Sequence, residues 1–199
     1  MQDEAPNGLC PAESLLLIGA LHPIEIFTAN GSTTDTMTHQ PSAHPIIEQL
    51  ASTVIGKYLS DDQIHKIVDV SQILEIHPGQ FLFREGQNNP YVYVMLDGQI
   101  DLVMQVRSRG SQRILSLGAG DLVAWSAILG NGTMTCSALC IRHTRLVAID
   151  ARLVLDRMQS DHEFGYQFMR LLSMALAQRL TATRLQLLDL FAPASPQST

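Results

Sequence analysis

The chain has 199 residues, of which 46% are hydrophobic and 16% are charged, and its formal net charge is -6. This composition favours one folded domain with a core, and no apolar run approaches the about 18 to 20 residues that cross a bilayer. Three cysteines are too few for a disulfide framework, so we expect a cytoplasmic protein that makes no membrane contact.

Residues 1–44 carry much of the negative charge, because they contain five acidic residues and no lysine or arginine. We expect an acidic, polar and partly disordered N-terminal arm over 1–44, within which the apolar stretch 14–27 docks on the body or covers a partner surface. The rest of the chain is nearly neutral and lacks the basic stripe that nucleic-acid binding requires. We therefore expect no nucleic-acid binding by this chain alone.

From residue 45 to about residue 69, apolar residues recur near a period of 3.6, which predicts two short helices. Ser60 is the expected N-cap of the second helix. After Ile73 the period changes to two, and the alternation predicts strands within 73–83 and 91–106.

Glycines then separate short apolar runs at regular intervals. This spacing is typical of an antiparallel sandwich or jelly roll, with hairpin turns expected at Asp97-Gly98 and Arg109-Gly110. The predicted fold is mainly β with flanking helices: an antiparallel β-roll, jelly-roll-like or of the double-stranded β-helix type, within a domain spanning 45–160. The glycines concerned are Gly79, Gly86, Gly98, Gly110, Gly118, Gly120, Gly130 and Gly132.

After the roll, the pattern predicts a short helix near 150–158 and a long amphipathic helix over 161–191, followed by a disordered tail at 192–199. About 30 residues make a helix of about 45 Å, longer than one small domain needs to cover its sheet. Apolar residues at alternating steps of three and four predict a seam that forms a homodimer. The predicted seam consists of Met169, Leu172, Leu176, Leu180, Thr183, Leu187 and Leu190.

This order of elements, together with three motifs, resembles a cyclic-nucleotide-binding domain of the catabolite activator (Crp/Fnr-like) superfamily. The motifs are Phe83-x-x-Gly86, the run from Tyr91 to Leu102 with its Asp-Gly pair, and Leu115-x-Leu-Gly-x-Gly120-Asp121-Leu-Val. The resemblance covers about residues 45 to 190 and implies a regulatory role in signal transduction.

In the family, the segment after the Gly-Asp pair is a phosphate-binding cassette: a glycine and a glutamate open a short helix, and an arginine about nine residues later neutralises the cyclic phosphate. Without gaps, Ala124 stands at the glycine, Trp125 at the glutamate and Met134 at the arginine. No lysine or arginine lies between Arg113 and Arg142, so we expect a degenerate cassette without a local cation. Its expected pocket residues are Val123, Ala124, Trp125, Ser126, Ile128, Leu129, Met134 and Thr135.

Loss of an arginine–phosphate pair weakens binding by about 2 to 5 kcal/mol, so ordinary cAMP binding is not expected. Trp125 either fills the nucleotide space or stacks on a different planar ligand. We therefore expect no cofactor, and leave open an unidentified small-molecule effector.

No catalytic motif is present, and we expect no enzyme activity. Residues 75–79 resemble the opening of a cupin metal motif, but only His77 of its several ligands is present, so no metal site is expected.

The transcription factors of this family place a helix-turn-helix module after the long helix, and residues 192–199 cannot form one. The sequence thus favours a stand-alone regulatory or sensory domain that acts through a partner protein. A ligand-free dimerisation or interaction module on the same fold is the main alternative. A cAMP-responsive regulator and a cupin-like metalloenzyme are less favoured.

Overall fold

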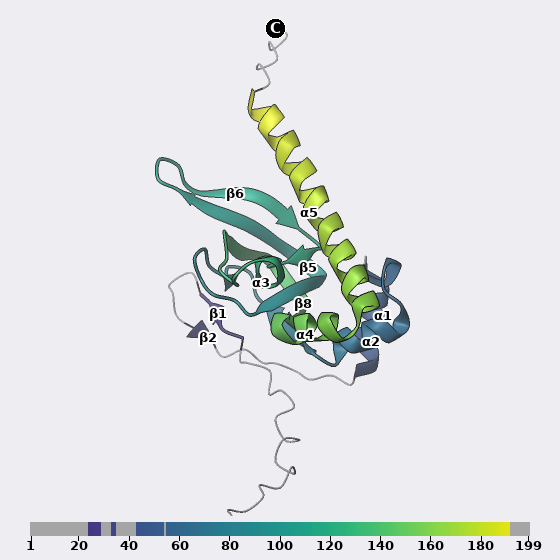
Figure 1. Cartoon of the computed structure of the whole chain (residues 1–199). Coiled ribbons are helices and arrows are strands. Elements are labelled where there is room, and N and C mark those ends of the chain that lie inside the picture. Colours follow the sequence, from purple (N-terminus) through teal and green to yellow (C-terminus); the bar gives the residue numbers. More distant parts are fainter. Residues whose placement is uncertain (1–23, 29–32, 35–42, 54, 192–199) are drawn as a thin grey trace, which may run out of the picture.

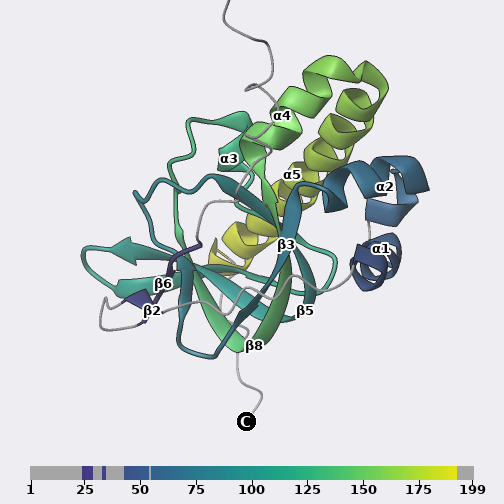
Figure 2. The ribbon, with the colours of Figure 1, turned by 90° about the horizontal axis from the view of Figure 1, so that it is seen from below.

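The computed structural model describes residues 24–28, 33–34, 43–53 and 55–191. An antiparallel β-roll carries its helices on one side, as Figures 1 and 2 show. The helices are α1 (Ala43–Ala51), the 3-10 helix η1 (Ile55–Lys57), α2 (Asp61–Val68), α3 (Ser126–Leu129), α4 (Ala151–Ser160) and α5 (His162–Phe191). The strands are β1 (Ile26–Phe27), β2 (Thr33–Thr34), β3 (Ser71–Ile76), β4 (Phe81–Phe83), β5 (Tyr91–Val106), β6 (Gly110–Leu117), β7 (Leu122–Val123) and β8 (Ser137–Asp150).

The two long strands β5 and β8 organise the roll, because they pair with each other along most of their length. Strand β6 pairs with the second half of β5, whereas β3 and β4 pair with opposite halves of β8. All of these pairs are antiparallel, which confirms the predicted fold class.

The hairpin turn expected at Asp97-Gly98 is wrong, because β5 continues through both residues. The pairing register with β8 shifts on either side of Gly98, which marks a bulge within a continuous strand. Gly98 has a φ of 96°, and a Cβ there would lie 2.4 Å from the carbonyl oxygen of His143. The glycine therefore permits a close approach of two strands. The second expected turn is confirmed, since Val106 pairs with Gly110.

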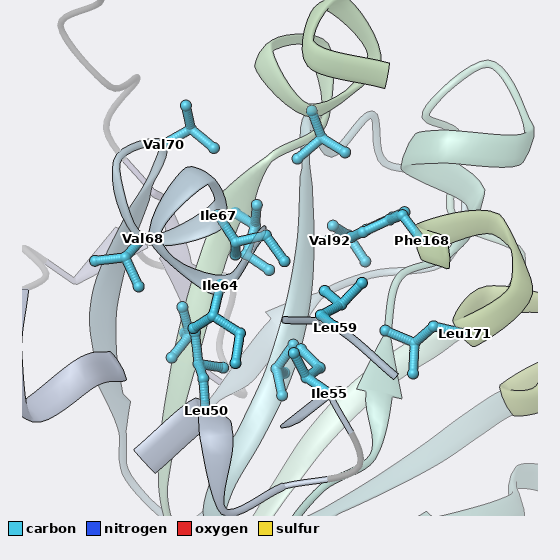
Figure 3. Close-up of a cluster of buried hydrophobic side chains, with 14 of the residues drawn as sticks. Leu50, Ile55, Leu59, Ile64, Ile67, Val68, Val70, Val92, Phe168 and Leu171 are labelled. Carbon is cyan, nitrogen blue, oxygen red and sulfur yellow. The ribbon is translucent and has the colours of Figure 1, made fainter. Parts of the chain in front are cut away.

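Two clusters of buried side chains flank the sheet. One fills the interior of the roll with residues such as Tyr93, Met95 and Leu146. The other joins the helices to the outer face of the sheet, where Leu50 and Ile67 of the N-terminal helices meet strand and α5 residues (Figure 3). This second cluster fixes the start of α5 against the roll.

Helix α5 is packed at its beginning and exposed further along. Phe164, Phe168 and Leu172 are buried in the chain's own core. Leu180 and Leu185 are 53% and 58% exposed. Figure 1 shows the later part of α5 passing beside β6 and continuing beyond the roll.

The predicted dimer seam is therefore divided. Leu172 is buried within the chain and Met169 packs against the same core, so a partner could not pair with Leu172. Leu176 and Thr183 are half-buried, and Leu180 is exposed. The side chains of Leu187 and Leu190 lie outside the described residues. The α5 surface open to a partner thus lies beyond the first turns of the helix.

The described part of the N-terminal arm confirms docking as a strand. Ile24 and Ile26 are buried in the roll, and β1 pairs with β4 through Phe27 and Phe81. The disorder expected for parts of 1–44 and for 192–199 concerns residues outside those described. Within the described ranges, no helix is both long enough and apolar enough to cross a membrane.

Candidate functional site

A tight turn positions the segment expected to form the cassette. The Asp121 carboxylate accepts a hydrogen bond of 2.8 Å from the backbone N–H of Gly118. The backbone of Met95 in β5 accepts from Gly120 and donates to Asp121. These bonds hold the loop 118–121 on β5, so the short strand β7 and the residues after it start from a fixed place.

Ala124 follows β7 in a left-handed conformation, with a φ of 63°. Among the described residues it is the only non-glycine with a positive φ. Such a conformation costs a residue with a Cβ about 1 to 2 kcal/mol relative to the right-handed region. Ala124 stands where the family resemblance places a glycine, so the backbone shape of the cassette is kept although the residue is not. Trp125 follows as the N-cap residue of α3.

The cavity beside this segment is small, at about 30 Å³. Five of the eight predicted pocket residues line it: Ala124, Trp125, Ser126, Met134 and Thr135. The other predicted residues do not: Val123 is fully buried in the roll, Ile128 packs in the helical cluster, and Leu129 is 42% exposed. Val123 lies in β7 and faces the roll cluster, whereas Ile128 and Leu129 lie in the second half of α3 and are not part of the cavity lining.

Arg179 of α5 is a lining residue that the sequence reasoning missed. Its guanidinium donates a hydrogen bond to the carbonyl oxygen of Leu122 in β7. The cassette segment contains no lysine or arginine of its own, but the distant helix α5 places one beside it, which the sequence reasoning did not anticipate. Leu172 and Leu176 precede it by seven and three residues, which places Arg179 on the face of α5 that packs on the body. That position is the one sequence signal that could have found it.

Arg179 is half-buried, and the nearby carboxylate that interacts with it is Asp121. Burial lowers the pKa of its guanidinium, and the negative charges of Asp121 and of an ionised Cys136 oppose that shift. Conversely, burial raises the pKa of the Cys136 thiol, and Arg179 lowers it in part. At neutral pH the arginine stays charged, and its guanidinium donates to the carbonyl oxygen of Leu122.

The size of the cavity limits its chemistry. A water needs about 10 to 15 Å³ of cavity volume, so this cavity holds about two or three waters and no nucleotide without movement. Trp125 and Met134 occupy the walls where the resemblance implies an acid and an arginine. Within the described ranges, no group of three histidine, cysteine or acidic side chains could hold a metal ion. His77 is exposed, and the centroid of its ring lies 5.2 Å from the centroid of the His143 ring.

Comparison with known proteins identifies this region. Residues 73–161 match the family model of the cyclic nucleotide-binding domain. A lysophospholipase, nte1, of Neurospora crassa is 27% identical over 89 residues, which are 45% of this chain and 6% of that protein. A cGMP-dependent protein kinase, egl-4, of Caenorhabditis briggsae is 28% identical over 95 residues, 47% of this chain and 13% of the kinase. The chain thus spans a small part of the length of either relative.

Solved structures share the fold. A cyclic nucleotide-binding domain from Methylobacillus flagellatus superposes with a TM-score of 0.65 at 17% identity, covering 77% of this chain and 86% of that one. The sensor domain of the transcriptional regulator DNR from Pseudomonas aeruginosa gives 0.57 at 16% identity, with 70% and 93% covered. At these identities the similarity supports the fold and leaves the ligand open.

Proposed function

We propose that the chain, whose residues 73–161 match the cyclic nucleotide-binding domain, is a regulatory or sensory module whose cassette does not take ordinary cyclic nucleotides. In this proposal the module acts in the cytoplasm, and a change in the position of α5 carries its signal. The proposal assigns no catalytic step and no DNA contact to this chain, because no described cluster of side chains supports either.

One observation carries this proposal: the cassette cavity measures about 30 Å³, and Trp125, Met134 and Arg179 are among its walls. A cyclic nucleotide would have to displace the indole and the thioether, and it would lack an arginine from the cassette itself. Loss of a buried arginine–phosphate pair corresponds to about 2 to 5 kcal/mol, or some 30-fold to several thousand-fold in affinity.

Arg179 links the cassette to the output. Because it donates to Leu122 from α5, any movement of the cassette segment alters a bond that holds the helix. We propose that α5 passes this change to a partner through its exposed residues, with a second copy of the chain as the first candidate. Leu180 and Leu185 supply the apolar surface for that contact.

A second candidate function is a ligand-free interaction module on the same fold. A cavity too small for a nucleotide is also what a module without a ligand would have. The exposed side of α5 could contact a partner in either function. The two candidates differ in whether any small molecule stabilises the protein.

Thermal unfolding in the presence of cAMP or cGMP tests the proposal. A micromolar ligand at about 1 mM adds about 4 kcal/mol and raises the Tm of a protein of this size by roughly 8 to 16 °C. We expect shifts below about 2 °C for both nucleotides, because displaced wall residues and a missing cassette arginine leave only millimolar affinity. A shift of 8 °C or more, by the same estimate of about 4 kcal/mol, would overturn the proposal.

A further inference from the structure

A second cavity, more than ten times larger than the cassette cavity, lies between the N-terminal helical segment and α5. Its volume is about 380 Å³, against about 30 Å³ beside Trp125. Pockets that bind small organic molecules typically measure about 300 to 1,000 Å³. By size alone, the cavity under α5 accommodates a ligand and the cassette cavity does not.

The walls of this cavity come from segments far apart in the sequence. Lys57 belongs to η1, Leu96 to β5, Leu122 to β7, and Leu171 and Met174 to α5. Figure 1 shows α5 passing beside the N-terminal helices before it crosses the roll. A molecule in this space would therefore touch the helical segment, the roll and α5 at once.

Most polar groups around the cavity are already satisfied. The hydroxyls of Ser52 and Thr53 donate to the carbonyl oxygens of Gln49 and Leu50. The Asp121 carboxylate accepts from the backbone of the turn at Gly118. These groups offer little binding capacity to a ligand.

Two polar side chains remain for recognition. Among the described residues, neither the ammonium of Lys57 nor the amide of Gln178 has a hydrogen-bond or ion-pair partner within the protein, and both line the cavity. The remaining walls include Leu96, Leu171 and Met174, and a methionine adapts its shape to an apolar ligand. The combination is an apolar floor with one cation and one amide at its edge, beside the Asp121 carboxylate, whose charge is offset by the hydrogen bond from Gly118 and by nearby Arg179.

We propose that this cavity is the effector site and binds a small organic anion with an apolar body, such as an aromatic or short aliphatic carboxylate or sulfonate. The anionic group pairs with Lys57, the apolar body lies on Leu171 and Met174, and the amide of Gln178 donates the orienting hydrogen bond. This inference rests on the proposed function, because it names the site at which the regulatory domain senses its ligand.

The location also gives the ligand a way to act. Asp121 and Leu122 line the cavity and lead directly into the cassette, while Ala175 and Gln178 line it four residues and one residue before Arg179. The ligand would thus contact both sides of the bond between Arg179 and Leu122. Occupancy of the cavity would fix α5 in one position relative to the roll.

Two fluorescent probes test the site on the full chain: anilinonaphthalene sulfonate, which has an apolar body and an anionic group, and the neutral N-phenylnaphthylamine. We expect one saturable sulfonate site per chain. Ala175→Phe fills the cavity from α5 and should weaken binding at least tenfold. Ala177→Phe is the matched control, because Ala177 is exposed on the same helix, and it should leave binding unchanged.

The charge of the site is tested separately. Lys57→Glu changes an exposed side chain, so the variant is expected to fold, and it should weaken the sulfonate at least tenfold while leaving the neutral probe within twofold. Equal sulfonate affinity in the wild type and either Ala175→Phe or Lys57→Glu would overturn the site. A nucleotide-induced Tm shift without displacement of the probe would instead overturn the proposed function alone.

Discussion

Replacing Arg179 with methionine probes the bond between α5 and the cassette. The substitution keeps most of the apolar stem and removes the guanidinium that donates to Leu122. A hydrogen bond from a charged group contributes about 1.5 to 3 kcal/mol, and relief of the burial that lowers the pKa of this cation offsets a part, so the net loss is about 1 to 2 kcal/mol.

Thermal unfolding gives the readout. For a chain of this size, that loss corresponds to a fall in Tm of roughly 2 to 8 °C. Arg184→Met is the control, because Arg184 is exposed on the same helix and the charge change is identical. A surface substitution of this kind stays within about 0.5 kcal/mol, or less than about 2 °C.

A local measurement separates the loss of the hydrogen bond between Arg179 and Leu122 from a general loss of stability. Trp125 is the single tryptophan and lines the same cavity as Arg179, so its emission maximum reports the cassette. We expect Arg179→Met to shift that emission and to speed amide exchange in α5. Equal Tm values and unchanged emission in Arg179→Met and Arg184→Met would refute the claim that the bond between Arg179 and Leu122 holds α5 to the cassette.

Three further predictions concern the fold, the helix and pH. Gly98→Ala should lower the free energy of unfolding in urea by about 1 to 3 kcal/mol more than Gly79→Ala, because both have positive φ but only the Cβ at residue 98 meets backbone; equal losses would contradict this. Leu172→Ala should cost about 2 to 5 kcal/mol, whereas Leu180→Glu should leave stability unchanged and shift light scattering towards the monomer; a dimer that survives Leu180→Glu would exclude this seam. A hydrogen bond from a lysine holds the pKa of Asp161 below its usual 3.8, so the stability difference between wild type and Asp161→Asn should persist above about pH 4 and vanish as pH falls below the folded pKa; a difference that grows in acid would reverse the assigned sign.

The fold was accessible from the sequence because its signals are local. The apolar runs at 91–96 and 100–106 and the glycine at 110 define the strands and the hairpin between them. Gly98 misled the prediction, since an Asp-Gly pair has the same local signature in a hairpin turn as in a bulge. Only the pairing with β8 distinguishes the two, and that pairing is a long-range property.

The candidate site was accessible in part. The residues around Ala124 and Met134 were found through motif spacing, and the positive φ of Ala124 agrees with its place at a family glycine. Arg179 was missed because it lies 57 residues from its acceptor, Leu122, and reaches the cassette only through the packing of α5. The larger cavity was missed for the same reason, because residues of the N-terminal helical segment, the roll and α5 come together only in the fold.

Calorimetric titration of cAMP into the wild type and the Trp125→Glu/Met134→Arg double variant tests the central claim most directly. The variant restores the acid and the arginine that the family resemblance implies, at positions that line the cassette cavity. The account predicts no saturable heat for the wild type up to about 1 mM and an affinity at least about 30-fold higher for the variant, as expected when an arginine–phosphate pair is regained. Micromolar binding by the wild type, equal to or tighter than that of the variant, would contradict the account.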